Sequence, residues 1–243
     1  MSLSIIFSLF YCLFNGLIYL YGARQTHSYS VMTNKKSIRI TVGSCLLIVS
    51  MVAGLFVYST ISPKELTAEE YKQIGFYKLV RTRQINNFEL LIGSEKFTNE
   101  SLKGSWDVLF LGFASCPDMC PMTMKKMAMA ASKLTPEISS RVNFRMISVD
   151  PDRDTPNKMQ RYAKAFNENF SGIAGNIEII YKLATDLTLP FVPVLGSDVT
   201  NYDMDHSMNL ALIDPDGNYF GFFKSPPTPD KLSEVLTSVV SYN

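Results

Sequence analysis

The sequence has almost no net charge, few histidines and few cysteines. Its 243 residues carry 23 Lys and Arg against 22 Asp and Glu, a net charge of +1. Because no surplus of cations is available for phosphates, the balance argues against a dedicated nucleic-acid binder. Four Cys are too few for a disulfide-stapled miniprotein, and two His are too few for a histidine-rich metal cage. At 47% apolar and 19% charged residues, the chain is also unlike a disordered or fibrous protein.

Acidic residues are absent from the first 61 positions. The four positive charges of this segment are Arg24, Lys35, Lys36 and Arg39. The rest of the chain keeps 19 positive against 22 negative charges. The chain therefore divides into an apolar head with basic flanks and a mildly acidic body.

An apolar run without Asp, Glu, Lys or Arg covers residues 40–61. As a helix it would be roughly 30 Å long, the thickness of a bilayer core. The alternative is a buried core helix, but such helices rarely run this long without a charge. No small-x-small cleavage pattern follows the run, so we expect an uncleaved transmembrane anchor. By the positive-inside rule, Lys35, Lys36 and Arg39 belong in the cytoplasm and the body belongs outside it, in the periplasm of a bacterium.

A second apolar run, Leu3–Tyr21, precedes the anchor within residues 1–39. One interpretation is a second spanning helix, which makes a two-pass protein. The other is a natural start at Met32, which leaves a short basic tail before a single anchor. The compact pattern after Met32 favours the second interpretation, and both stay open. The N-terminus lacks an Arg-rich amphipathic presequence, which favours the inner (cytoplasmic) membrane of a bacterium over a mitochondrial membrane.

The body is predicted to be an α/β sandwich. Residues 62–85 suggest a linker with a short helix capped by Thr67, and residues 86–243 suggest one domain. The continuous apolar run Val108–Phe113 predicts a buried central strand. The remaining predicted strands are Phe88–Leu91, Val142–Val149, and a hairpin of His206–Ile213 and Tyr219–Phe223 around the turn sequence DPDG; the predicted helices are Met122–Leu134, Pro156–Asn167, Ile177–Leu187 and Thr228–Val240. This order predicts helices on both faces of the sheet.

The segment GFASCPDMCPMT, with Cys116 and Cys120, follows the predicted central strand. Ligands of open α/β sheets bind at such strand ends. Pro121 favours a helix that begins there with Cys120 as its cap, so that the helix N-terminus would stabilise both thiolates. Two adjacent thiolates can form a disulfide or bind a soft metal. The plainest alternative is a structural disulfide.

His206 is the only histidine of the body and a candidate third ligand. If the predicted strand that begins at His206 lies beside the central strand, the loop before it reaches the same edge of the sheet as the cysteines. Two thiolates and one imidazole suit copper, as Cu(I) or as Cu(II) with a weak fourth ligand. Structural zinc usually needs four protein ligands, so zinc would require a carboxylate as well.

Methionines surround both motifs. Met119, Met122, Met124, Met127 and Met129 crowd the cysteine loop and its helix, and Met204 and Met208 flank His206. Thioethers bind Cu(I), but Met is also a flexible filler of cores, and we expect core or surface packing for the helix members.

Acidic residues also lie near the two predicted strand ends. The run DPDRDTP from Asp150 predicts a turn and a helix cap at Thr155, with Arg153 paired to a neighbouring carboxylate, rather than a hard-cation site. Asp118, between the cysteines, either tunes their pKa or faces solvent.

The chain resembles the Sco/SenC family of membrane-anchored copper proteins. The resemblance rests on FLGFASCPDMCPMT, ISVDPDRDTP, VPVLG and DHSMNLALIDPDG, in that order after an N-terminal anchor. It implies a thioredoxin-like fold and a copper site of Cys116, Cys120 and His206. It also implies a role in assembling cytochrome c oxidase, by delivering copper to the dinuclear site of subunit II, by reducing the cysteines of that subunit, or both. Other copper carriers or thiol reductants would then be further partners, and some bacterial members act in redox sensing or oxidative-stress defence.

Three functions compete for the same residues. A copper metallochaperone, which is a carrier rather than an enzyme, needs Cys116, Cys120 and His206. A thiol–disulfide oxidoreductase needs the two cysteines as catalytic residues but not His206. A thiol peroxidase, which thioredoxin-like folds also support, ranks last. The presence of His206 favours the copper metallochaperone.

Overall fold

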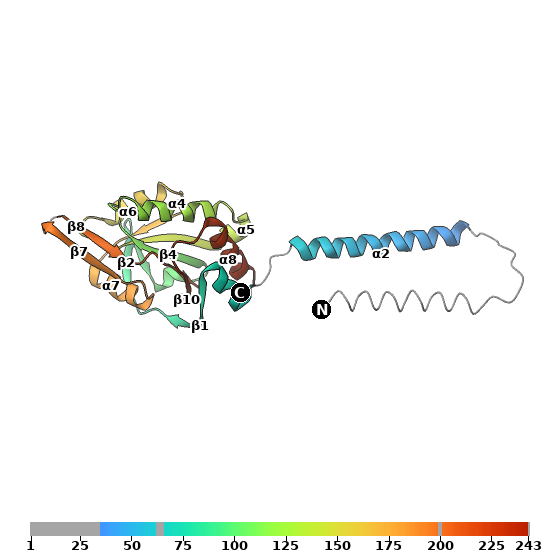
Figure 1. The fold of residues 1–243 in the computed structure, drawn as a ribbon, viewed down its shortest axis with the longest axis horizontal. Helices are drawn as coiled ribbons and strands as arrows, with labels where there is room; N and C mark the ends of the chain where they lie inside the picture. Colours follow the sequence, from blue (N-terminus) through green and yellow to red (C-terminus); the bar gives the residue numbers. More distant parts are fainter. Residues whose placement is uncertain (1–34, 62–65, 199–200, 243) are drawn as a thin grey trace, which may run out of the picture. The chain divides into compact units, whose positions relative to one another are not determined.

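The computed structural model describes residues 35–61, 66–198 and 201–242 (Figure 1). The chain forms two compact units, residues 1–62 and 63–243. The second apolar run, Leu3–Tyr21, and the proposed start at Met32 lie outside the described residues.

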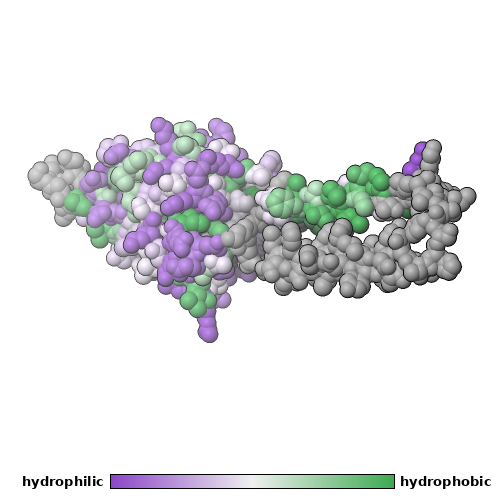
Figure 2. Space-filling model, turned by 45° about the vertical axis from the view of Figure 1, so that its right-hand side comes forward, coloured by the Kyte–Doolittle hydropathy of each residue, from purple (hydrophilic) through white to green (hydrophobic). Residues whose placement is uncertain are grey.

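The first unit contains one long helix, α2 (Lys35–Ile61). It begins five residues before the expected span, because Lys and Arg are good helix formers and nothing between Lys35 and Arg39 breaks the helix. The stretch Val42–Thr60 has a mean hydropathy of 2.1, and none of it is buried inside the structure. By length and composition it is sufficient to cross a membrane. The apolar side chains of α2 are exposed, Leu47 for example at 73% (Figure 2). Among the described residues, α2 therefore lacks the burial that a core helix would show.

Residues 62–85 are not the linker that the sequence suggested. Helix α3 (Ala68–Ile74) begins with the predicted capping box of Thr67 and Glu70, and strand β1 (Phe76–Gln84) follows directly. Strand β1 pairs antiparallel with β10 (Asn218–Phe223) at the edge of the main sheet. Most of its residues are exposed, so it lacks the apolar alternation by which a strand is recognised.

The main sheet has six strands in the order β1-β10-β9-β4-β5-β6. Strand β4 (Trp106–Gly112) lies inside it, parallel to β5 (Val142–Ser148) and antiparallel to β9 (Leu210–Ile213). Strand β6 (Ser171–Ile173) continues the parallel part beyond β5. All seven residues of β4 are buried, so both faces of the sheet are covered at its centre, as the continuous apolar run predicted.

The predicted helices are confirmed with shifted ends. They are α4 (Met119–Ala131), α6 (Pro156–Lys164), α7 (Ile177–Asp186) and α8 (Pro229–Tyr242), and a short α5 (Pro136–Ser139) is added. Helix α4 packs against α8, and α6 packs against β5 and β6. A small ribbon of β2 (Glu89–Ile92) and β3 (Glu95–Thr98) precedes the 3₁₀ turn Asn99–Leu102.

The predicted strand His206–Ile213 is wrong in its first half. Strand β9 begins only at Leu210 and pairs with β10 around the DPDG turn, which confirms that part of the hairpin. His206 instead ends β8 (Asn201–His206), which pairs antiparallel with β7 (Phe191–Asp198) in a separate ribbon. The sequence does not reveal this ribbon, because Pro193 and Gly196 argue against a strand in a central sheet. A two-stranded ribbon outside that sheet tolerates both residues.

Asp107 of β4 forms an ion pair with Arg145 of β5 in the interior. The Asp107 side chain is fully buried. Burial raises the pKa of this carboxyl to about 6 from 3.8, although the Arg145 guanidinium pulls in the opposite direction. The folded pKa is thus above the unfolded one, so the stability that Asp107 contributes is complete below about pH 3.8 and is lost as the pH rises to about 6.

We predict that the free energy of unfolding falls by about 3 kcal/mol between pH 4 and pH 6 because of Asp107. Chemical denaturation of the full chain in detergent measures it across this range. Asp107→Asn should remove this part of the pH dependence, and Glu95→Gln, a change at an exposed carboxylate, should retain it. An equal pH dependence in Asp107→Asn and in the parent would contradict the assignment.

Candidate metal centre

Cys120 lies in the first turn of α4, which begins at Met119 with Asp118 as its N-cap. The predicted start at Pro121, with Cys120 as the cap, is therefore wrong by two residues. Pro121 becomes the third residue of the helix, where a backbone N–H would have no helical partner in any case. The N–H of Met122 then makes the first helical hydrogen bond, to the Asp118 carbonyl at 3.2 Å.

The two cysteines are free thiols of unequal exposure. Cys116 is half-buried in the turn after β4, and Cys120 is fully buried beneath it. The backbone N–H of Cys120 donates a hydrogen bond to Sγ of Cys116 at 3.3 Å. A Cβ at Gly112 would lie 2.9 Å from Sγ of Cys120, so glycine at the end of β4 leaves room for the buried sulfur.

His206 reaches the cysteines from the end of β8. Its Nε2 lies 3.3 Å from Sγ of Cys120, and its Nδ1 lies 3.2 Å from the carbonyl oxygen of Ser207. The rings of Phe110 and Phe113 meet the imidazole edge-on, at centroid distances of 5.7 and 5.9 Å. With Nδ1–H donated to Ser207, the lone pair of Nε2 faces the buried thiol.

Burial controls the ionisation of both groups. It raises the pKa of the Cys120 thiol well above its usual range and lowers that of the His206 imidazole. The expected stabilisation of thiolates by the helix N-terminus is therefore outweighed at Cys120. Without metal, the pair is a neutral thiol and a neutral imidazole, and a metal that binds must displace the thiol proton.

The three predicted site residues come together. One ligand atom each of Cys116, Cys120 and His206 lies within 4.8 Å of the others, close enough to hold one metal ion. Within the described residues, this group includes no carboxylate. Two sulfurs and one nitrogen suit a soft metal with few ligands and lack the fourth ligand of structural zinc.

Asp154 fixes the cysteine loop from the neighbouring strand end, a role that the sequence analysis missed. Its Oδ2 accepts hydrogen bonds from the N–H of Ala114 at 2.8 Å and from the hydroxyl of Ser148 at 2.9 Å. Its Oδ1 accepts from the Lys158 ammonium at 2.9 Å. The signal was available, because β4 and β5 were both predicted and the ends of parallel neighbours share an edge.

The rest of this acidic run has the predicted role of a turn and helix cap. The ion pair of Arg153 with Asp150 closes the turn, and Thr155 caps α6. Asp118 faces solvent.

The methionines divide into two groups. Met124 and Met127 are fully buried, which confirms core packing for these two helix residues, and Met204 is nearly buried as well. Met119, Met122 and Met129 are exposed, at 39%, 38% and 55%, so these three helix residues lie at the surface and not in the core.

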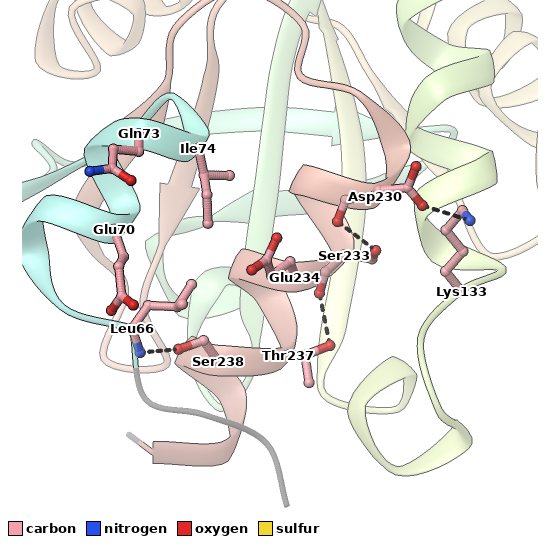
Figure 3. Close-up of a pocket in the computed structure, with 10 residues that line it drawn as sticks. All are labelled: Leu66, Glu70, Gln73, Ile74, Lys133, Asp230, Ser233, Glu234, Thr237 and Ser238. Carbon is pink, nitrogen blue, oxygen red and sulfur yellow. Dashed lines mark hydrogen bonds and ion pairs between the residues drawn. The ribbon is translucent and has the colours of Figure 1, made fainter. Parts of the chain in front are cut away.

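A pocket of about 550 Å³ between α3 and α8 is a separate feature (Figure 3). The hydroxyl of Ser238 accepts a hydrogen bond from the N–H of Leu66 at 3.1 Å, and the ammonium of Lys133 pairs with Asp230 at 2.8 Å. These contacts tie neighbouring elements together, and neither cysteine nor His206 lines the pocket.

Comparison with known proteins places the same motifs in one family. The profile of the SCO1/SenC family matches residues 80–241. A protein of Stutzerimonas stutzeri that is named for copper binding is 37% identical over 169 residues, which cover 69% of this chain and 82% of that protein. An SCO2-like protein of Rickettsia conorii is 29% identical over 82% of this chain and 98% of its own length.

Solved structures agree with the fold. ScoI of Bradyrhizobium japonicum with copper bound is similar at a TM-score of 0.57 and 30% identity, over 63% of this chain and 97% of that chain. The mixed sheet with its covering helices matches such structures, which confirms the predicted thioredoxin-like fold.

We predict that Asp154→Asn weakens the metal centre without removing a ligand. An amide offers one acceptor oxygen in place of two, so either the Ala114 N–H or the Lys158 ammonium loses its partner. The expected loss is about 1–3 kcal/mol of stability and roughly tenfold in Cu(I) affinity. Thermal unfolding and competition with a chromophoric Cu(I) chelator measure the two effects. Asp152→Asn, at an exposed position of the same turn, is the control, and equal affinities in both variants would contradict the role of Asp154.

Proposed function

Because the chain belongs to the SCO1/SenC family, we propose that it is a membrane-anchored copper carrier with Cys116, Cys120 and His206 as metal ligands. The observation that carries the proposal is the convergence of two sulfurs and one imidazole nitrogen within 4.8 Å. This donor set suits copper, and a copper-bound structure of a 30% identical relative supports the choice of metal.

The cargo of this carrier would be Cu(I) held by two thiolates and the imidazole. Cys116 is the more exposed of the two sulfur ligands, so an incoming thiolate of a recipient would reach the metal on that side. The recipient sulfur forms a bond to copper, the bond to Cys116 breaks, and the Cys116 thiolate takes up a proton. Further recipient ligands then replace Cys120, whose thiolate also takes up a proton, and His206. The metal keeps its oxidation state, so handover needs no oxidant or reductant. By the family resemblance, the proposed recipient is the dinuclear copper site of cytochrome c oxidase subunit II.

A second function, reduction of a partner disulfide, is favoured by the unequal exposure of the thiols. The half-buried Cys116 can attack a partner disulfide, form a mixed disulfide and release one partner thiolate. The buried Cys120 then attacks Cys116, which yields the Cys116–Cys120 disulfide and the second partner thiol. Two electrons pass to the partner, and His206 is not required. The cysteines of the same oxidase subunit are suitable substrates.

The location of the body follows from the charges beside α2. We propose that the anchor lies in the inner membrane of a bacterium, with Lys35, Lys36 and Arg39 in the cytoplasm and the copper-binding body in the periplasm. An exported compartment also suits a dithiol that cycles with a disulfide.

His206→Ala tests the ligand set and separates the two functions. The dithiol should still hold Cu(I), since two thiolates suffice for linear coordination. Cu(II) favours nitrogen, so its affinity should fall by more than roughly 100-fold and the visible thiolate-to-Cu(II) band should be lost or shifted. Disulfide exchange with an oxidised subunit II peptide should persist, whereas copper delivery to the reduced peptide should be impaired.

The control is Ser207→Ala, which keeps the backbone carbonyl that His206 contacts. If His206→Ala keeps the Cu(II) affinity and the band of the parent, His206 is not a ligand. The function would then reduce to that of a dithiol oxidoreductase that uses Cys116 and Cys120.

Topology is tested with a reporter joined after Asn243. A reporter that works only in the exported compartment should be active, because the body is proposed to lie outside the cytoplasm. Activity of a strictly cytoplasmic reporter at the same position would reverse the proposed orientation.

A further inference from the structure

Tyr162 carries a buried hydroxyl without a partner. Among the described residues, its Oη is one of the few buried side-chain oxygen atoms that make no hydrogen bond. Its ring is held against Phe166, edge to face at a centroid distance of 5.2 Å. Buried hydroxyls of native proteins are nearly always paired, so an orphan of this kind needs an explanation.

The position of Tyr162 on α6 directs it toward the cysteine loop. Lys158 and Tyr162 lie four residues apart and therefore on one side of α6, and the Lys158 ammonium pairs with Asp154, which precedes the helix, at 2.9 Å. Helical side chains tilt toward the helix N-terminus, and that end of α6 is where Asp154 holds Ala114 in the cysteine loop.

The charges that act on the phenol of Tyr162 also belong to the cysteine loop and to Asp154. Burial raises the pKa of Tyr162, and the next contributions in the same direction come from Cys120 and then Cys116, followed by Asp154. The two sulfurs and Asp154 are thus the groups whose charge acts on this phenol. A neutral thiol such as that of Cys120 without metal is a weak acceptor, whereas a thiolate is a strong one. A cysteine that binds a metal does so as a thiolate, so loading the site creates a strong acceptor in the cysteine loop.

We propose that Tyr162 is a positioning residue of the copper site, whose hydroxyl donates a hydrogen bond to the Cys120 sulfur when that sulfur is a copper-bound thiolate. The inference rests on the copper-carrier function proposed above. A hydrogen bond to a ligand sulfur withdraws electron density from it and tunes the metal, as other contacts just outside a ligand shell do. Tyr162 would therefore favour Cu(I), the cargo, over Cu(II).

The matching experiment is Tyr162→Phe in the full chain in detergent, a change that removes one oxygen and keeps the ring. Without metal, the melting temperature should stay equal or rise, because the hydroxyl has no partner to lose. With copper, Cu(I) affinity should fall roughly tenfold, the gain in melting temperature on Cu(I) loading should shrink, and the thiolate-to-Cu(II) band should shift. Tyr77→Phe, on edge strand β1, should match the parent in every measurement.

Two results would overturn the inference. One is a Cu(I) affinity within twofold of the parent together with an unshifted band. The other is an equal loss of melting temperature with and without copper, which would make Tyr162 a purely structural residue. If His206→Ala disturbs copper and Tyr162→Phe does not, only this inference fails. If neither the parent nor Tyr162→Phe binds copper, the proposed function fails, and the role of Tyr162 fails with it.

Discussion

The parallel pairing of β4 with β5 is the constraint on which the site depends. It aligns Gly112 with Ser148, and the N–H of Val149 donates to the Gly112 carbonyl at 2.9 Å. The two chains therefore leave the sheet side by side, so the cysteine loop after one strand meets the acidic turn after the other. Asp154 joins the two through Ala114, and the antiparallel neighbour β9 follows the segment that carries His206.

Burial gives this site its chemical character. Burial keeps both the imidazole and the deeper thiol neutral. Their hydrogen bond therefore leaves no unpaired charge in the metal-free interior. A soft cation changes this balance, because it replaces the thiol proton and bonds to sulfur and nitrogen at once. The same burial that suppresses the free thiolate of Cys120 thus favours a metal as the partner that compensates it. Cys116, closer to the surface, remains the side from which a partner can enter.

The sequence was informative where one residue type or one pattern decides the outcome. The apolar run of β4, the caps Thr67 and Thr155, the DPDG turn and the convergence of Cys116, Cys120 and His206 were all predicted. Prediction failed where neighbours in space decide. Strand β1 is mostly exposed, and only its pairing with β10 identifies it. The ribbon that carries His206 contains Pro193, and Asp154 is recognised as a support of the loop only when the register of two strands is known.

The two functions proposed for the dithiol exclude each other at any one moment. A Cys116–Cys120 disulfide leaves His206 as the remaining ligand of the group, so the oxidised chain cannot hold copper in the same way. Bound copper in turn occupies the lone pairs with which the thiolates would attack a disulfide. Each transfer therefore fixes what the chain can do next: reduction of a partner ends in a disulfide that must be reduced before copper can be loaded. A chain that carried out both functions would therefore depend on a thiol reductant in its compartment, although copper handover alone needs none, and the shared sulfurs would couple copper supply to the redox state of that compartment.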